Sequence, residues 1–490
     1  MHSVFASPDR CRLKENFVRR TTDTNRIVKQ LCHACLALVA LAMLMTWSVN
    51  PCFAQAVDSG LPKDFGPPPP TPKEFAIENP LIKKDELSAW NKKRIEFQDA
   101  LSGKLSGNAP KTVDEGFRIN VHALSMTEHR DELTSLRKKI IRYIDVVIPA
   151  KNVATKQFAS KTVIKHALPL LDGNFLVRMH AVQLIGELNV SPQVPGIRPT
   201  PPVAYVHGLP VLLDVIHPPE GGVEQPEPVR ILAALGARHL LERGRHTLKI
   251  NSKVPADAVK RMLAQLEGDG IDWYHQRLIE AMVHTALATV PNEQNQQEPL
   301  IVETLARILA NPRRSNQIRA RAARLLGRTP MPGGQQSAPI AYVIVKLTQK
   351  IATEVNQKRL PVATALFQFN DIYLAFVPEK KGESTTDGRK VAGLKSTLSQ
   401  QPIQAAYKDI LPVVASLFQQ VQDTPTGKPL TARINPALIS KLNDWPKPDD
   451  MALSAGRVSI LLPMRKPKPA TSKKALPQAR RQGNNANSAS

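Results

Sequence analysis

Two short apolar segments separated by a polar turn form the clearest pattern in the chain. They lie within residues 166–188 and meet at Asp172, Gly173 and Asn174. After the turn, apolar residues recur at gaps of three and four, the spacing of a helix that buries one face. These residues are Leu176, Val177, Ala181, Leu184, Ile185 and Leu188. Because Ala181 and Gly186 are small, we expect a neighbouring helix to approach closely there.

Similar paired segments recur along the chain, and the second segment of each carries an arginine near its start. The residue numbers of these arginines differ by 52, 47 and 42. Paired-helix repeats have a period of roughly 40–47 residues, and stacked copies bury the face that one pair cannot bury alone. The arginines are Arg178, Arg230, Arg277 and Arg319. We therefore predict a repeat array over residues 159–330, with first helices that begin near Val163, Leu209, Val259 and Leu300.

The segments LPLLDGNFLVRMHAVQLIGEL and LPVLLDVI…EPVRILAALGARHLL resemble HEAT-type repeats, the armadillo-like α-solenoid family. In that family a proline often kinks the first helix, and Pro169 and Pro210 are placed to do so. The resemblance also implies a hydrogen-bonded ladder between an aspartate in the turn and an arginine of the second helix. Asp172 and Arg178 match this pair in type and spacing. The further ladder positions implied are Arg230, Arg277 and Arg319.

Helical segments are also predicted on both sides of the array. Residues 81–158 read as an N-terminal helical cap, in which Ser125 and Glu128 match a capping box ahead of an amphipathic stripe. That stripe is Leu133, Leu136, Ile140, Ile144 and Val147. Residues 340–445 contain three further periodic apolar segments, at 340–355, 361–377 and 401–421. The predicted class is all-α, a HEAT-like α-solenoid with helical caps and disordered termini.

The first 56 residues have the pattern of an export signal. Leu31 to Val49 are almost wholly apolar, and Ala54-Gln55-Ala56 is a small-x-small cleavage pattern. We expect cleavage after Ala56 and a protein in the periplasm, cell envelope or medium. The alternative is an uncleaved membrane anchor, because the apolar run approaches spanning length. All four cysteines precede Val57, so the mature chain would contain no thiol.

Two segments at the ends of the folded part have biased compositions. Residues 57–80 are rich in proline and predict an extended linker. Residues 446–490 predict a disordered tail, because lysine, proline and small polar residues dominate them. Residues 465–490 contain seven lysines or arginines and no acid. This tail could bind an anionic envelope polymer. We do not expect nucleic acid binding, because the tail has no aromatic residues to stack on bases.

The formal net charge of +24 does not by itself identify a partner. A basic surface can attract anionic partners over a distance, but it can equally serve only to keep a protein soluble. The sequence has none of the common catalytic, phosphate-binding or metal-binding motifs. We therefore expect no cofactor and no metal, and we assign no catalytic residue.

One aromatic pair stands out as a candidate contact for a partner. Trp273 and Tyr274 precede Arg277 by about one helical turn, and these residue types are common at interfaces. The alternative is that the pair packs inside its own helix pair. We expect a binding protein or scaffold that meets a protein partner along the second helices, an expectation that rests on analogy with solenoids. The alternatives are an enzyme with a dispersed active site and a binder of anionic polymer.

Overall fold

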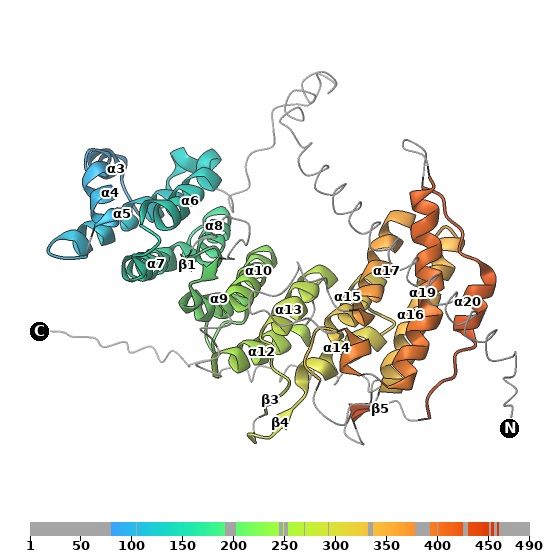
Figure 1. Cartoon of the computed structure of the whole chain (residues 1–490). Helices are drawn as coiled ribbons and strands as arrows, with labels where there is room; N and C mark the ends of the chain where they lie inside the picture. The colour runs from blue at the N-terminus through green and yellow to red at the C-terminus, as the bar shows by residue number, and fades with distance from the viewer. Residues whose placement is uncertain are drawn as a thin grey trace, which may run out of the picture.

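The computed structural model describes the chain between residues 80 and 459, with internal gaps (Figure 1). The described ranges are 80–103, 105–191, 202–244, 248, 253–268, 270–292, 294–331, 337–377, 393–398, 400–424, 430–449, 452–454 and 458–459. The predicted export signal, the linker apart from Pro80, the four cysteines and most of the basic tail lie outside these residues.

Helices provide nearly all the regular structure in the described ranges, so the prediction of a mainly helical chain is confirmed. The described strands form three short antiparallel ribbons, of which two connect helices and the third follows α20. These are β1 (Asn189–Ser191) with β2 (Val203–Ala204), β3 (Val290–Pro291) with β4 (Gln297–Glu298), and β5 (Ala452–Ser454) with β6 (Val458–Ser459). Across the described ranges, none of the helices is both long enough and apolar enough to span a bilayer.

The N-terminal region is a small helical group with an aromatic centre. Its α-helices are α3 (Lys84–Asn91), α4 (Arg94–Ser102), α5 (Ala109–His122) and α6 (Leu133–Arg142), with the 3-10 turns η2 (Ala123–Ser125) and η3 (Thr127–Glu132) and the π-helical turn η4 (Tyr143–Val147). The ring of Phe97 meets those of Trp90, Phe117 and Tyr143 edge-on, at centroid distances of 5.7, 5.3 and 5.1 Å. This geometry is favourable for aromatic side chains.

The predicted capping box at Ser125 is wrong. The Ser125 hydroxyl donates to the carbonyl of His122 and accepts from the backbone N–H of Leu81. The chain then makes a 3-10 turn, and α6 begins only at Leu133. Ser125 therefore ties the start of the folded region to the end of α5 instead of beginning a helix.

Four helix pairs occupy the centre of the chain. The pairs are α7 (Val153–Ala167) with α8 (Phe175–Gly186), α9 (Leu209–Ile216) with α10 (Glu227–Arg243), α12 (Lys253–Leu266) with α13 (Asp272–His284), and α14 (Leu300–Ala310) with α15 (Asn316–Leu326). The turn predicted at 172–174 is present, and the Asn174 side chain accepts the Val177 N–H to cap α8. The starts predicted at Leu209 and Leu300 are confirmed, whereas α7 and α12 begin earlier than predicted.

The two prolines expected to kink first helices act at helix ends. Pro169 lies in the 3-10 turn η5 (Leu168–Asp172) that follows α7. Pro210 lies in the first turn of α9, where its missing N–H costs nothing. Neither proline interrupts an α-helix.

In the described residues, five helices follow the central pairs. They are α16 (Ser337–Asn356), α17 (Val362–Phe376), α18 (Leu394–Thr397), α19 (Gln401–Gln422) and α20 (Pro436–Asn443). The periodic segments at 340–355, 361–377 and 401–421 correspond to α16, α17 and α19, so these three predicted helices are confirmed. Helices α19 and α20 both pack on α16.

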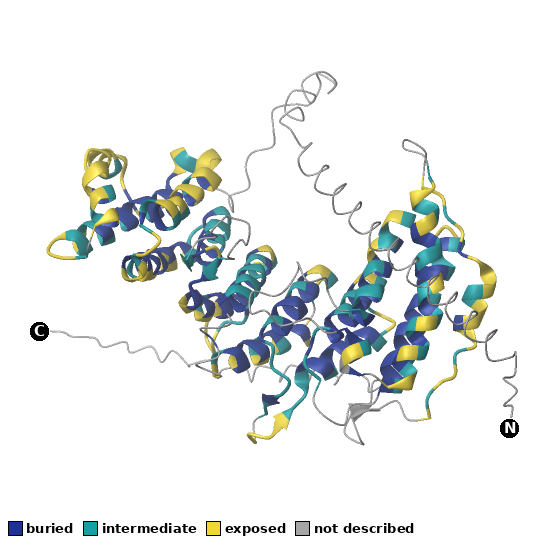
Figure 2. Cartoon of the chain, viewed as in Figure 1, coloured by how far each residue is buried: buried dark blue, intermediate teal, exposed yellow. Residues whose placement is uncertain are grey.

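The second helices of the pairs lie side by side in one row. Helix α8 packs on α10, α10 on α13, α13 on α15, and α15 on α17. The helices follow an arc, with this row on the concave side and α9, α12 and α14 on the convex side (Figure 1). Buried residues gather where helices face one another (Figure 2). We call the exposed surface of α8, α10, α13, α15 and α17 the inner face.

Candidate functional site

The first two ladder arginines connect neighbouring helix pairs, but not through Asp172. Arg178 donates from Nε to the carbonyl of Gly173 and from Nη1 to Oε1 of Gln225, at 3.2 Å. Gln225 is buried just before α10 and donates to the carbonyl of Leu171 at 3.5 Å. Arg178 therefore fixes its own turn to the next pair, and an amide takes the place that the resemblance gave to a carboxylate.

Arg230 makes the equivalent connection one pair further on. Its Nη1 atom donates to Oε1 of Gln265 at 3.0 Å and to Oε1 of Glu224 at 2.7 Å. Its guanidinium also lies over the ring of Tyr274, 5.4 Å from the centroid. Because Gln265 and Tyr274 belong to the α12–α13 pair, Arg230 bridges two pairs as Arg178 does.

The other two predicted ladder arginines, Arg319 and Arg277, do not make the equivalent connection. Arg319 is buried and donates from Nε to the carbonyl of Leu309 at 2.8 Å, within its own pair. Burial lowers the pKa of the Arg319 guanidinium, opposed by the charge of Glu354. The α12–α13 and α14–α15 pairs are instead connected by Arg314, which donates to Asp272 at 3.2 Å. Arg277 belongs to a different cluster, described below.

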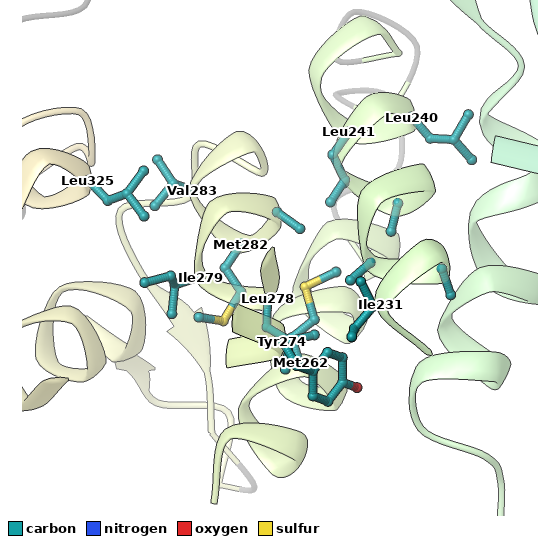
Figure 3. Close-up of a cluster of buried hydrophobic side chains, with 14 of the residues drawn as sticks. Ile231, Leu240, Leu241, Met262, Tyr274, Leu278, Ile279, Met282, Val283 and Leu325 are labelled. Carbon is teal, nitrogen blue, oxygen red and sulfur yellow. The ribbon is translucent and has the colours of Figure 1, made fainter. Parts of the chain in front are cut away.

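The candidate contact pair Trp273 and Tyr274 is divided between the surface and the core. Tyr274 is only 1% exposed, and Figure 3 shows its ring beside Met262 and Ile231. Burial raises the pKa of its hydroxyl. Trp273 is 47% exposed, with the Arg277 guanidinium 5.5 Å from its ring centroid. Tyr274 is therefore a core residue, and the prediction that it contacts a partner is corrected; Trp273 remains available.

Glu280 is the centre of a cluster of arginines on the inner face. This buried carboxylate on α13 accepts from Arg238 of α10 at 2.9 Å and from Arg277 at 2.8 Å. Gln276 donates to its other oxygen at 3.0 Å, and Arg321 of α15 lies 3.5 Å away. Burial alone would raise the pKa of Glu280, but the Gln276 hydrogen bond and the three guanidiniums outweigh it and hold the pKa below its ordinary value.

A second buried carboxylate extends the cluster to the next helix. Asp371 of α17 pairs with Arg321 at 3.2 Å and with Arg324 at 3.0 Å. Arg321 therefore joins Glu280 to Asp371, and the contacts cross four consecutive helices of the row. We call this set the arginine strip: Arg238, Arg277, Glu280, Arg321, Arg324 and Asp371.

The arginine strip carries more positive than negative charge. Among the residues that the structure describes, four guanidiniums face two carboxylates, a balance of +2 at neutral pH. The nearby Glu242 and Arg328 carry opposite charges and do not alter this balance. The arginine side chains are between 19% and 37% exposed. Each guanidinium has five N–H donors, and Arg238, Arg277 and Arg321 all face the single carboxylate of Glu280.

Two exposed aromatic residues lie one helical turn from members of the strip, on two of the helices that pack against α15. Trp273 lies one turn before Arg277 on α13, and Phe367 lies one turn before Asp371 on α17. Residues four apart on a helix share a face. Phe367 is 75% exposed. On α15, between them, the exposed Gln317 precedes Arg321 by one turn.

Sequence reasoning missed most of this site. Arg277 and Trp273 were singled out, but Arg238, Arg321, Arg324 and Phe367 were not, nor were the two carboxylates they surround. The sequence held a signal for three of them: Glu280 interrupts an apolar run on α13, and Arg321 and Arg324 are three residues apart on α15. The order of residues in the sequence does not show that α10, α13, α15 and α17 lie side by side.

A separate polar cluster lies in the N-terminal region. His166 of α7 lies 3.2 Å from Oδ1 of Asp114 on α5, and its ring meets that of His122 edge-on at 5.5 Å. Burial lowers the pKa of His122 to about 4, with the charges of His166 and Arg118 acting in the same direction. Burial also lowers the pKa of His166, opposed by Asp114, and the contact between His166 and Asp114 joins α7 to α5.

Among the described residues, no group of three or more histidine, cysteine, aspartate or glutamate residues is arranged to hold a metal ion. The chain matches no protein-family model, no curated protein and no solved structure in the comparisons made.

Proposed function

We propose that residues 159–330 form a HEAT-like α-solenoid and that the protein is a non-enzymatic scaffold that binds a protein partner along its inner face. The side-by-side row α8, α10, α13, α15 and α17 supports the solenoid. So do the polar bridges from Arg178, Arg230 and Arg314 to neighbouring pairs. Stacked helix pairs that contact only their neighbours form extended concave binding surfaces.

The observation that carries this proposal is the arginine strip on the inner face. Partly exposed ion pairs contribute little to stability, so stability alone does not account for a row of arginines that exceeds its carboxylates. Here four arginines share two carboxylates and remain partly exposed, with Trp273 beside them. Arginine and tryptophan are enriched among the residues that contribute most to protein interfaces.

The place of action that we propose is the cell envelope or the medium. The apolar run Leu31–Val49 followed by Ala54-Gln55-Ala56 supports export. The partner would then be another envelope or secreted protein. The basic tail would add a weak, salt-sensitive attraction for anionic polymer to this specific contact.

Quantitative affinity capture tests the proposed function. The full chain is immobilised and incubated with envelope and secreted proteins of the cell that makes it. Two variants are compared, each of which places an aspartate at an exposed apolar position: Phe367→Asp on the inner face and Ile95→Asp on α4, where Ile95 is 71% exposed.

We expect the wild type and Ile95→Asp to retain the same protein, and Phe367→Asp to lose at least nine-tenths of it. Equal thermal midpoints would show that all three chains fold alike. If Phe367→Asp retains every protein that Ile95→Asp retains, the inner face is not the binding surface and the proposal fails.

A further inference from the structure

We propose that the arginine strip and the two nearby exposed aromatic residues, Trp273 and Phe367, bind a short extended segment of a protein that carries acidic side chains between apolar ones. This inference rests on the proposed function and deepens it, because it specifies the chemistry of the partner. Its two components, a rigid excess of guanidinium groups and a pair of exposed rings, are independent features of the inner face.

The guanidinium groups are fixed in place before any ligand arrives. Arg238 and Arg277 are both held by the buried Glu280, and Arg324 is held by the buried Asp371. A fixed guanidinium loses less side-chain entropy on binding than a free one. Its planar fork also matches the two oxygens of a carboxylate. The strip therefore favours carboxylates presented at a defined position.

The modest charge excess selects against a dense polyanion. A balance of +2 can neutralise about two ligand charges, whereas binding of a polyphosphate or nucleic acid depends on many simultaneous cation contacts. The two carboxylates of the strip also repel additional negative charge. A segment with about two acidic residues fits the strip better than a polymer with one charge per unit.

The two aromatic rings supply apolar contacts on the helices either side of α15. Phe367 is 75% exposed, an unusual position for a phenylalanine. Trp273 is 47% exposed and lies against Arg277, so its ring is restrained. Aromatic residues and arginines are the residue types enriched at the centres of protein interfaces.

The spacing of the helices that carry the rings sets the length of the segment. Trp273 and Phe367 lie on α13 and α17, which are separated by α15. Adjacent packed helices are about 8–10 Å apart, so the axes of α13 and α17 lie roughly 16–20 Å apart. An extended chain rises about 3.3 Å per residue. A segment of about five or six residues would therefore reach from α13 to α17.

Selection from a random peptide library displayed on phage tests this inference directly. The full chain is the target. Recovered peptides are synthesised, and their affinities are measured for the wild type, Arg238→Ala, Phe367→Ala and the matched control Ile95→Ala. Inorganic polyphosphate is titrated in parallel as the polyanion probe, and thermal midpoints report folding of each variant.

We expect recovered peptides to be enriched in aspartate and glutamate with apolar residues about five positions apart. Their affinity should fall at least fivefold for Arg238→Ala and for Phe367→Ala and should not change for Ile95→Ala. The inference is overturned if the peptides show no acidic enrichment, if none is recovered, or if all variants bind them equally. It is also overturned if polyphosphate binds the strip more tightly than the peptides do.

The two proposals fail in different ways. If affinity capture retains a partner that Phe367→Asp loses, while the recovered peptides are not acidic, the inner face is a binding surface for other chemistry. If affinity capture gives no partner dependent on Phe367, the proposed function itself fails.

Discussion

Position along the helix separates the arginines of the row into two groups. Arg178 and Arg230 lie near the starts of α8 and α10 and donate to side chains of the next helix pair. Arg238 and Arg277 lie further along their helices and keep part of the guanidinium in solvent. Residues of the first group hold the pairs in register, whereas those of the second can also contact a ligand.

Arg178→Ala is expected to destabilise the fold. The substitution leaves the buried Gln225 side chain and the Gly173 carbonyl without the guanidinium that bonds them. Loss of such a partner costs on the order of 1–3 kcal/mol. Chemical denaturation should show this loss for Arg178→Ala and almost none for Arg313→Ala, because Arg313 is exposed. Equal stabilities of the two variants would show that Arg178 is only a surface charge.

His275 is expected to make stability fall in mild acid. Its ring is almost fully buried, and burial together with the charge of Arg314 lowers its pKa to about 4, although Asp272 and Glu227 act in the opposite direction. Below the ordinary pKa of about 6.5, the unfolded chain therefore binds a proton that the folded chain does not. Stability is then full above pH 6.5 and decreases as the pH falls toward 4.

The measurement is the free energy of unfolding at pH 7 and pH 5. His275→Gln keeps a side chain that can accept from Arg314 and should lose less stability over this interval than the wild type, by on the order of 1–2 kcal/mol. The exposed His207 provides the control, since His207→Gln should leave the slope unchanged. An unchanged slope in His275→Gln would contradict the prediction.

The sequence predicted which residue types lie at the turns but not all their partners. An arginine after the turn was correctly singled out, whereas its acceptor Gln225 lies 47 residues away. The division between Trp273 and Tyr274 could have been predicted from periodicity. Tyr274, Leu278 and Met282 form the buried stripe of α13, and Trp273 falls outside it.

Helix contacts in this protein depend on small residues at the crossing points. Gly186 of α8 and Gly236 of α10 face each other, and a Cβ atom added at Gly186 would lie 2.6 Å from the Cα atom of Gly236. The sequence indicated a close approach at Gly186 but not the glycine on the other helix. The backbone of Gly236 cannot move away from such a Cβ atom as a flexible side chain could.

Gly186→Ala is therefore expected to be destabilising even though alanine favours helices. The added methyl group forces α8 and α10 apart, and overpacking of this kind costs about 1–3 kcal/mol. Gly268→Ala is the control, because its Cβ atom would make only an ordinary contact at 3.5 Å with the carbonyl of Gln265. Thermal denaturation should separate the two variants by several degrees. Equal midpoints would show that the helices can shift without cost.

Apolar periodicity predicted the long helices well, because each buries one continuous stripe. Helices α16, α17 and α19 lie within a few residues of their predicted limits. The prediction failed where a side chain had a distant partner. Ser125 matched a capping pattern locally, but its hydroxyl bonds Leu81, which is 44 residues away.

At the scale of the whole molecule, the candidate site depends on stacking that no local pattern encodes. Arg238, Glu280 and Asp371 belong to three different helices, and Arg321 on a fourth connects the two acids. The sequence identifies these four residues, but it does not show that they are in contact. That contact follows from the side-by-side packing of their helices. The net charge of +24 gave no indication of this position.

Site-specific photo-cross-linking in the producing cell tests the binding role of the inner face most directly. A photoreactive amino acid replaces either the exposed Gln317 on α15, beside the strip, or the exposed Lys260 on α12, on the convex side. Irradiation followed by electrophoresis shows which position forms a covalent adduct with another protein. We expect a discrete adduct from Gln317 that disappears when Phe367→Asp is added, and none from Lys260. Adducts from Lys260 alone, or from neither position, would contradict a partner on the inner face.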